Sequence, residues 1–367
     1  MGIFQEQILR GIKNNYFAPY SFHLNIIDTM EKHQTTIKEI AQALNVSIST
    51  VSRALKGDPR IGLRTTQRVN ELAKSLHYTP NPAALLLKNK KTFTIGVVLP
   101  YLKEEFFSMA ITGIEDILSE KGYNVFVSQS RDSYYREVKA IKSFINSRVD
   151  GVIVSLSVET ENYEHFKELE EFGIPVVFFD RTPVNFPAHT VKCNVLEGAF
   201  QIVNYLVSRG ITKIALINGT ESLGVSKERL DGYSSAIHKN GLKFAPDYVK
   251  FTNLTKEDTE VKMLELLALD DTPQAIFAFN DYVALDAMQV CKQHGYIPNK
   301  DIYFVSFANL PICTYMENPP IASVEQFAYT MGERAAEMLV NVIDDINTNS
   351  EEPFREVVLG TEIRIHC

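Results

Sequence analysis

The chain has 367 residues, of which 45% are hydrophobic and 22% charged, an ordinary balance for two or three globular domains. No apolar run approaches the roughly 18–20 residues that would span a membrane, no secretory leader is present, and the four scattered cysteines indicate reduced thiols in a cytoplasmic protein. The charge is uneven: residues 35–91 carry ten Lys or Arg and three Asp or Glu, whereas residues 92–367 carry 24 and 39. A compact basic segment on an acidic body predicts a head that binds a polyanion.

Residues 1–34 form an extension ahead of the first organised motif. Ile3, Phe4, Ile8 and Leu9 lie near helical spacing, so one interpretation is a short extra helix that packs on a partner. The other is that translation in the cell starts at Met30, which stands just before that motif. We favour the second interpretation, and N-terminal sequencing of the native protein would decide between the two.

Residues 35–80 predict three short helices. The first carries one apolar face, with Thr36 and Glu39 spaced as a capping box and Asn45 suited to its end. Ser47 predicts the start of a second helix with Val51 facing the core. The third helix is predicted over residues 65–76. Three helices in this order form a helix-turn-helix head whose second helix enters the major groove of DNA.

The head resembles the lactose/galactose repressor family in the runs I-K-E-I-A, V-S-x-x-T-V-S-R-A-L and H-Y-T-P-N-P, which occur in the family's order and spacing. The resemblance implies that Ile48, Ser49 and Arg53 read base edges, with Arg53 paired to a guanine and Ile48 against a thymine methyl. It also implies phosphate contacts, which position the protein without reading sequence. The residues implied for phosphate contacts are Ser47, Thr50 and Ser52. Lys56 and Gly62 replace the family's usual Asn and Ser, which leaves the operator sequence open.

Residues 81–91 read N-P-A-A-L-L-L-K-N-K-K and predict a hinge. Pro82 suits a first helical turn, but so few residues do not hold a helix alone in water. In the family, this segment becomes a helix on DNA, and the resemblance implies that Leu87 is the wedge that enters the minor groove. The alternative is a plain linker with an apolar anchor.

Residues 92–367 alternate short apolar strands with amphipathic helices, which predicts α/β architecture: two doubly wound parallel sheets with ligand between them at the carboxyl ends of the strands. By resemblance this is a periplasmic-binding-protein-like sensor that also dimerises. The first lobe is expected over about 92–192 and 326–350, and the second over about 193–325 and 351–367. The chain ends without an added leucine heptad, so we expect a homodimer instead of a tetramer.

The body also resembles the family in short runs such as G-I-P-V-V-F-F-D-R and E-R-L-D-G-Y. At the matching positions the resemblance implies ligand contacts from aromatic walls, a forked guanidinium and hydroxyl-binding groups. The alternatives are core packing for the phenylalanines and helix capping for Asp180 and Asp281; for Asp281 we favour the cap. The implied ligand residues are Phe106, Phe107, Asp180, Arg229, Asn280 and Asn309.

One departure concerns the ligand. The family commonly has an Asp that grips ligand hydroxyls where this chain has Ala308, with Asn309 beside it as a substitute. A sugar or sugar derivative is the default effector, and a phosphorylated or acidic sugar or a non-sugar ligand stays open. No cofactor, metal or membrane contact is expected. The sequence therefore predicts a DNA-binding regulator whose partners are operator DNA and a small-molecule effector. The alternative is a cytosolic sugar-binding or sugar-acting enzyme on the same fold, for which no catalytic motif is present.

Overall fold

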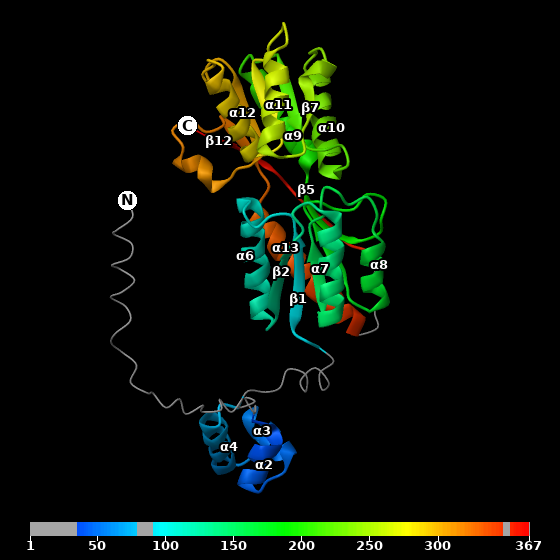
Figure 1. Ribbon diagram of the computed structural model, residues 1–367, viewed down its shortest axis with the longest axis vertical. Coiled ribbons are helices and arrows are strands. Elements are labelled where there is room, and N and C mark those ends of the chain that lie inside the picture. Colours follow the sequence, from blue (N-terminus) through cyan, green and yellow to red (C-terminus); the bar gives the residue numbers. More distant parts are fainter. Residues whose placement is uncertain (1–34, 79–90, 348–352, 367) are drawn as a thin grey trace, which may run out of the picture. The chain divides into compact units, whose positions relative to one another are not determined.

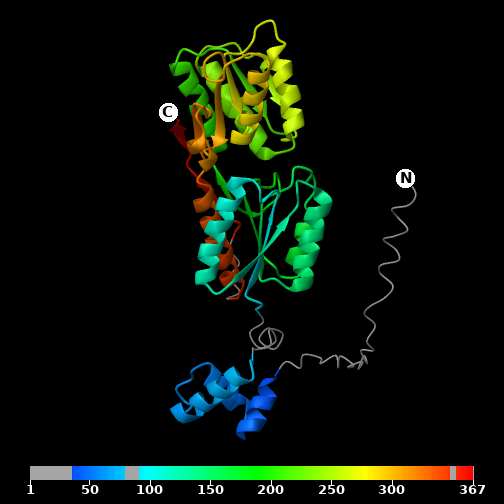
Figure 2. The same cartoon turned by 60° about the vertical axis from the view of Figure 1, so that its left-hand side comes forward.

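The computed structural model describes residues 35–78, 91–347 and 353–366, which fall into two compact units, a head and a body. The predicted hinge residues 81–90, with Leu87, and the extension ahead of residue 35, with Met30, lie outside the described residues. Figures 1 and 2 show the head as a small helical unit and the body as two stacked α/β lobes. No helix in the described part of the chain has the length and apolar content needed to cross a bilayer.

The head contains α2 (Ile37–Leu44), α3 (Ile48–Leu55) and α4 (Leu63–Ser75). The predicted capping box is present, because the Thr36 hydroxyl accepts from the Glu39 amide and the Glu39 carboxylate accepts from the Thr36 amide. Asn45 ends α2 with the left-handed φ of 54° that was expected. One fully buried residue from each helix meets in the core: Ile40, Val51 and Val69.

The first lobe of the body is built on a six-stranded parallel sheet of order β11-β5-β4-β3-β1-β2. Helices α6 and α13 cover one face of it, and α7 and α8 cover the other (Figure 2). The elements are β1 (Thr94–Leu99), α6 (Glu105–Glu120), β2 (Asn124–Gln129), α7 (Tyr134–Ser147), β3 (Gly151–Val154), α8 (Glu164–Glu171), β4 (Val176–Phe179), β5 (His189–Cys193), α13 (Ala328–Asn347) and β11 (Glu356–Leu359).

The second lobe has a sheet of order β12-β10-β9-β8-β6-β7, parallel except for β12, which runs antiparallel to β10. Helices α9 and α10 pack together on one face, and α11 and α12 on the other. The elements are α9 (Val195–Ser208), β6 (Ile214–Asn218), α10 (Gly224–Lys239), a 3-10 turn (Pro246–Tyr248), β7 (Val249–Phe251), α11 (Lys256–Leu267), β8 (Ala275–Ala278), α12 (Asp281–Gln293), β9 (Tyr303–Ala308), a 3-10 turn (Pro311–Tyr315), β10 (Ala322–Glu325) and β12 (Glu362–Ile365).

The predicted doubly wound architecture is confirmed, but the last segment of the chain does not lie in a single lobe as predicted. We expected residues 351–367 wholly in the second lobe. Instead β11 pairs with β5 in the first lobe, and only β12 joins the second. The chain therefore passes between the lobes three times: after β5, after β10 and between β11 and β12.

Two glycines let the helices of the first lobe approach closely. A Cβ on Gly113 of α6 would lie 2.2 Å from the Tyr329 carbonyl oxygen of α13, and one on Gly332 of α13 would lie 2.0 Å from the Ala110 carbonyl oxygen. No side chain fits at such distances, so only glycine permits this contact. This contact fixes α13, which comes late in the sequence, against α6. Helix α6 begins at the cleft between the lobes.

Candidate nucleic-acid interface and candidate ligand cleft

Helix α3 has one buried and one exposed face. Val51 and Ala54 are buried in the head, while Ile48, Ser49 and Arg53 are exposed on the other side of the same helix. Ile48 exposes 45% of its surface, so an apolar side chain stands on the outer face of the helix. The residues predicted to read base edges therefore share one solvent-facing surface, as an inserted recognition helix requires.

Hydroxyl groups gather at the start of α3. The Ser47 Oγ accepts a hydrogen bond from the Thr50 amide at 3.1 Å and lies 2.8 Å from both the Ser49 Oγ and the Thr50 Oγ1. Ser47 is thus first an N-cap, and its predicted phosphate contact is an additional role. Ser52, in the next turn, is half-buried. A helix N-terminus bearing hydroxyl donors favours a phosphate group.

Two arginines of the head differ in their partners. The Arg60 guanidinium lies 2.6 Å from the Asp58 carboxylate, and its hydrogen bonds hold the pKa of Asp58 well below the usual range. Arg53 has no ion-pair partner among residues 35–78 and 91–347. Its exposed positive charge is therefore available to an external hydrogen-bond acceptor such as a guanine edge.

A small cavity of about 30 Å³ lies in the body where the carboxyl ends of strands from both lobes meet. It brings together five of the six residues predicted to contact ligand. Its volume is far below the roughly 300–1,000 Å³ of typical ligand pockets. The lining residues are Glu104, Phe106, Phe107, Asp180, Arg181, Val225, Arg229, Phe279, Asn280, Ala308 and Gln326.

Asn309 is the predicted ligand residue that does not line this cavity. Its amide Nδ2 donates to the Glu325 Oε2 at 2.7 Å, so the side chain is used within the second lobe. The preceding Ala308 has φ of 98° and Asn309 has φ of 54°, both in the left-handed region. Such a backbone is costly for alanine, and strain of this kind concentrates at binding sites.

The capping role expected of Asp281 belongs to its neighbour. Asn280 is the N-cap of α12, and its Oδ1 accepts from the Val283 amide at 2.9 Å. The Asp281 carboxylate is fully buried and accepts from the Ser323 hydroxyl at 2.7 Å, from the Leu310 amide at 2.6 Å and from the Ser306 hydroxyl. Asp281 therefore ties strand ends together, and our prediction of a cap there was wrong because α12 begins at Asp281 itself, one residue earlier than a cap at Asp281 requires.

Two arginine side chains line the cleft, and they differ in their contacts with carboxylates of the described structure. Arg181 lies 2.6 Å from the Asp132 carboxylate, so its charge is balanced within the first lobe. Arg229, on α10, is 3% exposed; its Nη1 donates to the Val225 carbonyl oxygen at 3.3 Å, and its Nε has no hydrogen-bond partner in the described structure. Arg181 was missed as a cleft residue, although it directly follows Asp180 in the strand-end run.

Burial shifts the ionisation of the cleft residues. It lowers the pKa of Arg229 to about 10, since a buried charge without a contacting counter-charge is disfavoured. It raises the pKa of Asp180 and of Glu104, whose carboxylates are also withdrawn from water. The cleft therefore holds charged groups that are withdrawn from water.

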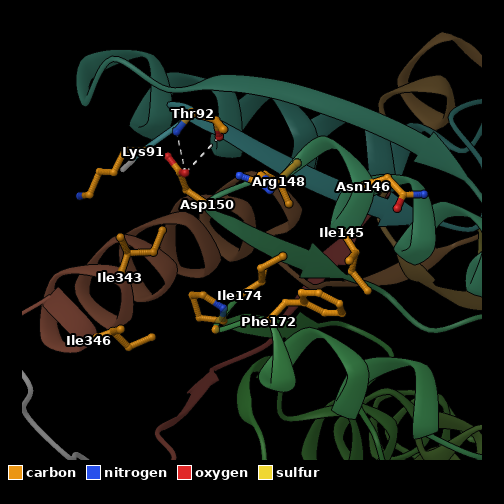
Figure 3. Close-up of a pocket in the computed structure, with 13 residues that line it drawn as sticks. Lys91, Thr92, Ile145, Asn146, Arg148, Asp150, Phe172, Ile174, Ile343 and Ile346 are labelled. Atoms are coloured by element: carbon orange, nitrogen blue, oxygen red, sulfur yellow. Dashed lines mark hydrogen bonds between the residues drawn. The ribbon is translucent and has the colours of Figure 1, made fainter. Parts of the chain in front are cut away.

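The larger cavity of the body, about 850 Å³, lies at the opposite end of the first sheet, where the chain enters β1 (Figure 3). There the Asp150 carboxylate accepts from the Thr92 amide at 2.8 Å, the Thr92 hydroxyl at 3.0 Å and the Phe93 amide at 2.7 Å. Ile174, Ile343 and other apolar side chains form the wall beside it. Asp150 thus fixes the first residues of the body to the start of β3.

Two family models match the chain. A model of bacterial regulatory proteins of the lacI family matches residues 36–81, and a periplasmic binding protein domain model matches residues 95–347. The chain belongs to the LacI family of bacterial regulatory proteins. The first match covers the head with α3, and the second covers both lobes and the cleft.

Similar proteins agree over the full architecture. Catabolite control protein A of Priestia megaterium is 30% identical over 86% of this chain and 94% of that protein. The HTH-type transcriptional repressor PurR of Vibrio cholerae is 29% identical over 84% of this chain and 92% of that protein. A solved complex of the transcriptional regulator CelR with cellobiose has a TM-score of 0.67 at 26% identity, covering 90% of this chain and 99% of that one.

These relatives establish the class of protein. The chain is a LacI-family transcriptional repressor with a DNA-binding head and a ligand-binding domain, and it is not an enzyme. The predictions of family, of fold class and of a regulator in place of an enzyme are confirmed.

Proposed function

We propose that this LacI-family repressor binds a palindromic operator as a homodimer, with operator affinity set by a small molecule, by default a sugar or sugar derivative, held in the cleft of the body. The observation that carries the DNA-reading part is the exposed face of α3, where Ile48, Ser49 and Arg53 lie opposite a buried core face. In this proposal Ser47, Thr50 and Ser52 contact phosphates and Leu87 inserts in the minor groove. Bacterial operator DNA lies in the cytoplasm, and the proposal places the repressor there.

The first test is operator recognition. Duplexes selected by the protein from a random library serve as the probe, and Arg53→Ala should reduce affinity for the selected duplex about 30-fold or more, because a lost bidentate guanine contact costs about 1–3 kcal/mol in each of two half-sites. The matched control is Arg68→Ala, an exposed arginine on α4 outside the reading face. Equal losses in both variants would mean that α3 contributes charge and no base readout.

A homodimer is supported by the edge of the first sheet. Strand β2 is the last strand of that sheet, and it exposes Phe126 and Val127 to 52% and 37%. An unpaired strand with exposed apolar side chains is a surface that a second copy covers. Light scattering on Phe126→Asp should show a monomer, whereas Val358→Asp on β11, at the other edge, should leave the dimer intact. A dimeric Phe126→Asp protein would move the interface elsewhere.

Ligand control is supported by the position of the cleft between the lobes. Five proposed contacts, Phe106, Phe107, Asp180, Arg229 and Asn280, come from both lobes, so ligand binding changes how the lobes meet. Affinity for DNA changes only by as much as the ligand prefers one arrangement over the other. In this proposal, a movement of the first lobe reaches the hinge through Asp150, whose carboxylate accepts hydrogen bonds from the amides of Thr92 and Phe93, the first residues after the hinge in the sequence.

A further inference from the structure

The two lobes are in direct contact beside the cleft, at a pair of loops. The Ser222 hydroxyl, in the second-lobe loop between β6 and α10, donates to the Val158 carbonyl oxygen in the first-lobe loop after β3 at 3.3 Å. Two residues further along, a Cβ on Gly224 would lie 3.2 Å from the Val184 Cγ2, so the start of α10 packs on the first-lobe loop after β4. The hydrogen bond from Ser222 to Val158, the interlobe bond, therefore depends on how the lobes meet.

One carboxylate oxygen connects the interlobe bond to the cleft. The Asp132 Oδ1 accepts from the Val158 amide at 3.1 Å and from the Arg181 Nη1 at 2.6 Å. Arg181 is buried and lines the cavity of the cleft, whereas Asp132 does not line it. Val158 thus uses its amide for Asp132 in its own lobe and its carbonyl oxygen for Ser222 in the other lobe.

The backbone at Asp132 is held in an unfavourable conformation. Arg131 and Asp132, in the loop between β2 and α7, have φ of 52° and 59°, so two successive residues other than glycine lie in the left-handed region. Such a conformation persists where surrounding contacts hold it, and it concentrates at functional sites. The charged hydrogen bond between Asp132 and Arg181 is one such contact, so a change at Arg181 acts directly on this loop.

A different acid fixes the residues on either side of Val158 to the first lobe. The buried Glu137 carboxylate of α7 accepts from the Ser157 amide and hydroxyl, both at 2.8 Å, and from the Thr160 hydroxyl at 2.7 Å. These bonds do not involve Asp132, so the loop should stay folded when Asp132 is changed. Between these fixed points, Val158 is oriented by Asp132 on one side and by Ser222 on the other.

We propose that Asp132 is a positioning residue that couples the cleft to the contact between the lobes. When a bound effector engages the Arg181 guanidinium, the hold of Arg181 on the Asp132 carboxylate changes, and the Val158 amide and the interlobe bond shift in response. The cleft thereby acts on the second lobe through a first-lobe residue that does not line the cavity. The proposal rests on the proposed function only in taking this cleft as the effector site.

Hydrogen–deuterium exchange of the full chain, without DNA or small molecules, measures this coupling. Ser222→Ala removes the interlobe bond. Asp132→Asn suits the left-handed backbone but weakens the hold on Arg181, because a neutral amide replaces the carboxylate. Each variant should raise the exchange rate of the amides in residues 220–224 about two- to threefold, as expected for the loss of one exposed hydrogen bond. Exchange in the buried strand β8 should not change, because the second lobe stays folded.

Asp132→Gly is the second variant at this position. Glycine adopts the left-handed backbone without strain, and its lack of a side chain removes both contacts of the carboxylate. Asp132→Gly should raise exchange in residues 220–224 at least as much as Asp132→Asn does. Unchanged exchange there in both variants would overturn the proposal.

The double variant of Asp132→Asn and Ser222→Ala separates coupling from two independent effects. If Asp132 acts through Val158, the double variant should exchange no faster in residues 220–224 than Ser222→Ala alone. Independent effects would multiply to about four- to ninefold, which would refute the coupling.

Asp150→Asn is the matched control, because Asp150 also binds backbone amides of the first lobe with its carboxylate, but at the opposite end of the sheet. It should leave exchange in residues 220–224 unchanged. An effect equal to that of Asp132→Asn would mean that general loosening of the first lobe suffices, and the role of Asp132 would fail. Loss of sequence-specific binding to the selected duplexes would instead refute the proposed function and leave the exchange result standing.

Discussion

Replacing Arg229 by methionine should stabilise the unliganded protein. Burial lowers the pKa of Arg229 from the ordinary arginine value to about 10, which means that the charged form is disfavoured by roughly 3 kcal/mol. Because the unfolded chain keeps the ordinary pKa, this penalty is fully present below pH 10 and disappears only as the pH rises toward the ordinary pKa of arginine. At neutral pH, removal of the charge therefore removes the whole penalty.

Two losses reduce the gain. The hydrogen bond to the Val225 carbonyl oxygen contributes about 1 kcal/mol, and the contacts with the two phenyl rings contribute about 0.5–1 kcal/mol, part of which a methionine sulfur recovers. The net expectation is a gain of about 1–2 kcal/mol, or a Tm about 2–6 °C higher.

Thermal and urea unfolding of the full chain at pH 7, without small anions other than chloride, measure this change. Arg181→Met is the matched control, since it leaves the Asp132 carboxylate unpaired and should destabilise the protein by about 2–4 kcal/mol. If Arg229→Met lowered the stability as much as Arg181→Met does, Arg229 would be a structural residue and the reasoning on its unbalanced charge would fail.

Three further outcomes follow from other contacts. Asp150→Asn should lower the free energy of unfolding by about 1–3 kcal/mol and weaken binding to selected duplexes, because a charged acceptor of three hydrogen bonds is lost; unchanged affinity would separate this contact from DNA binding. Thr36→Ala should destabilise the head by about 1 kcal/mol in calorimetry while the transition of the body stays fixed. Burial raises the pKa of the thiols of Cys193, Cys291 and Cys313 to about 12. Alkylation at pH 8 should therefore leave these three thiols unmodified until the chain unfolds, as checked by mass spectrometry. Labelling in the native state would show that the body opens.

Much of the fold could be predicted from short-range patterns. Buried strands such as β1, β3 and β6 stand in the sequence as apolar runs, and the capping box at Thr36 and Glu39 is local in the chain. Strands β5, β11 and β12 could not be recognised in this way, because they are short, mix polar with apolar residues and acquire their partners from distant segments. The pairing of β11 with β5 depends on tertiary packing, which the local pattern of apolar and polar residues does not predict.

The candidate cleft was predictable to the extent that parallel strands end at one edge of a sheet. Residues just beyond strand ends, such as Asp180 and Asn280, meet there as expected. Asn309 does not line this cavity and stays a prediction as a ligand residue; the left-handed backbone at Ala308 and Asn309 could not be foreseen, because an alanine gives no warning of a positive φ. The contrast between Arg181 and Arg229 could not be foreseen, since only the fold brings Asp132 to one arginine and withholds an acid from the other.

The three passages of the chain between the lobes affect how the protein is made. The first lobe takes α13 and β11 from residues 328–359, far along the chain from its other strands, so its sheet is missing an edge strand and a covering helix until those residues have been synthesised. Neither lobe is a contiguous stretch that could emerge from the ribosome and complete itself. The head, whose contacts are all local, can fold while the rest is still being translated, so a truncated product would carry a finished DNA-reading unit without the receptor that controls it.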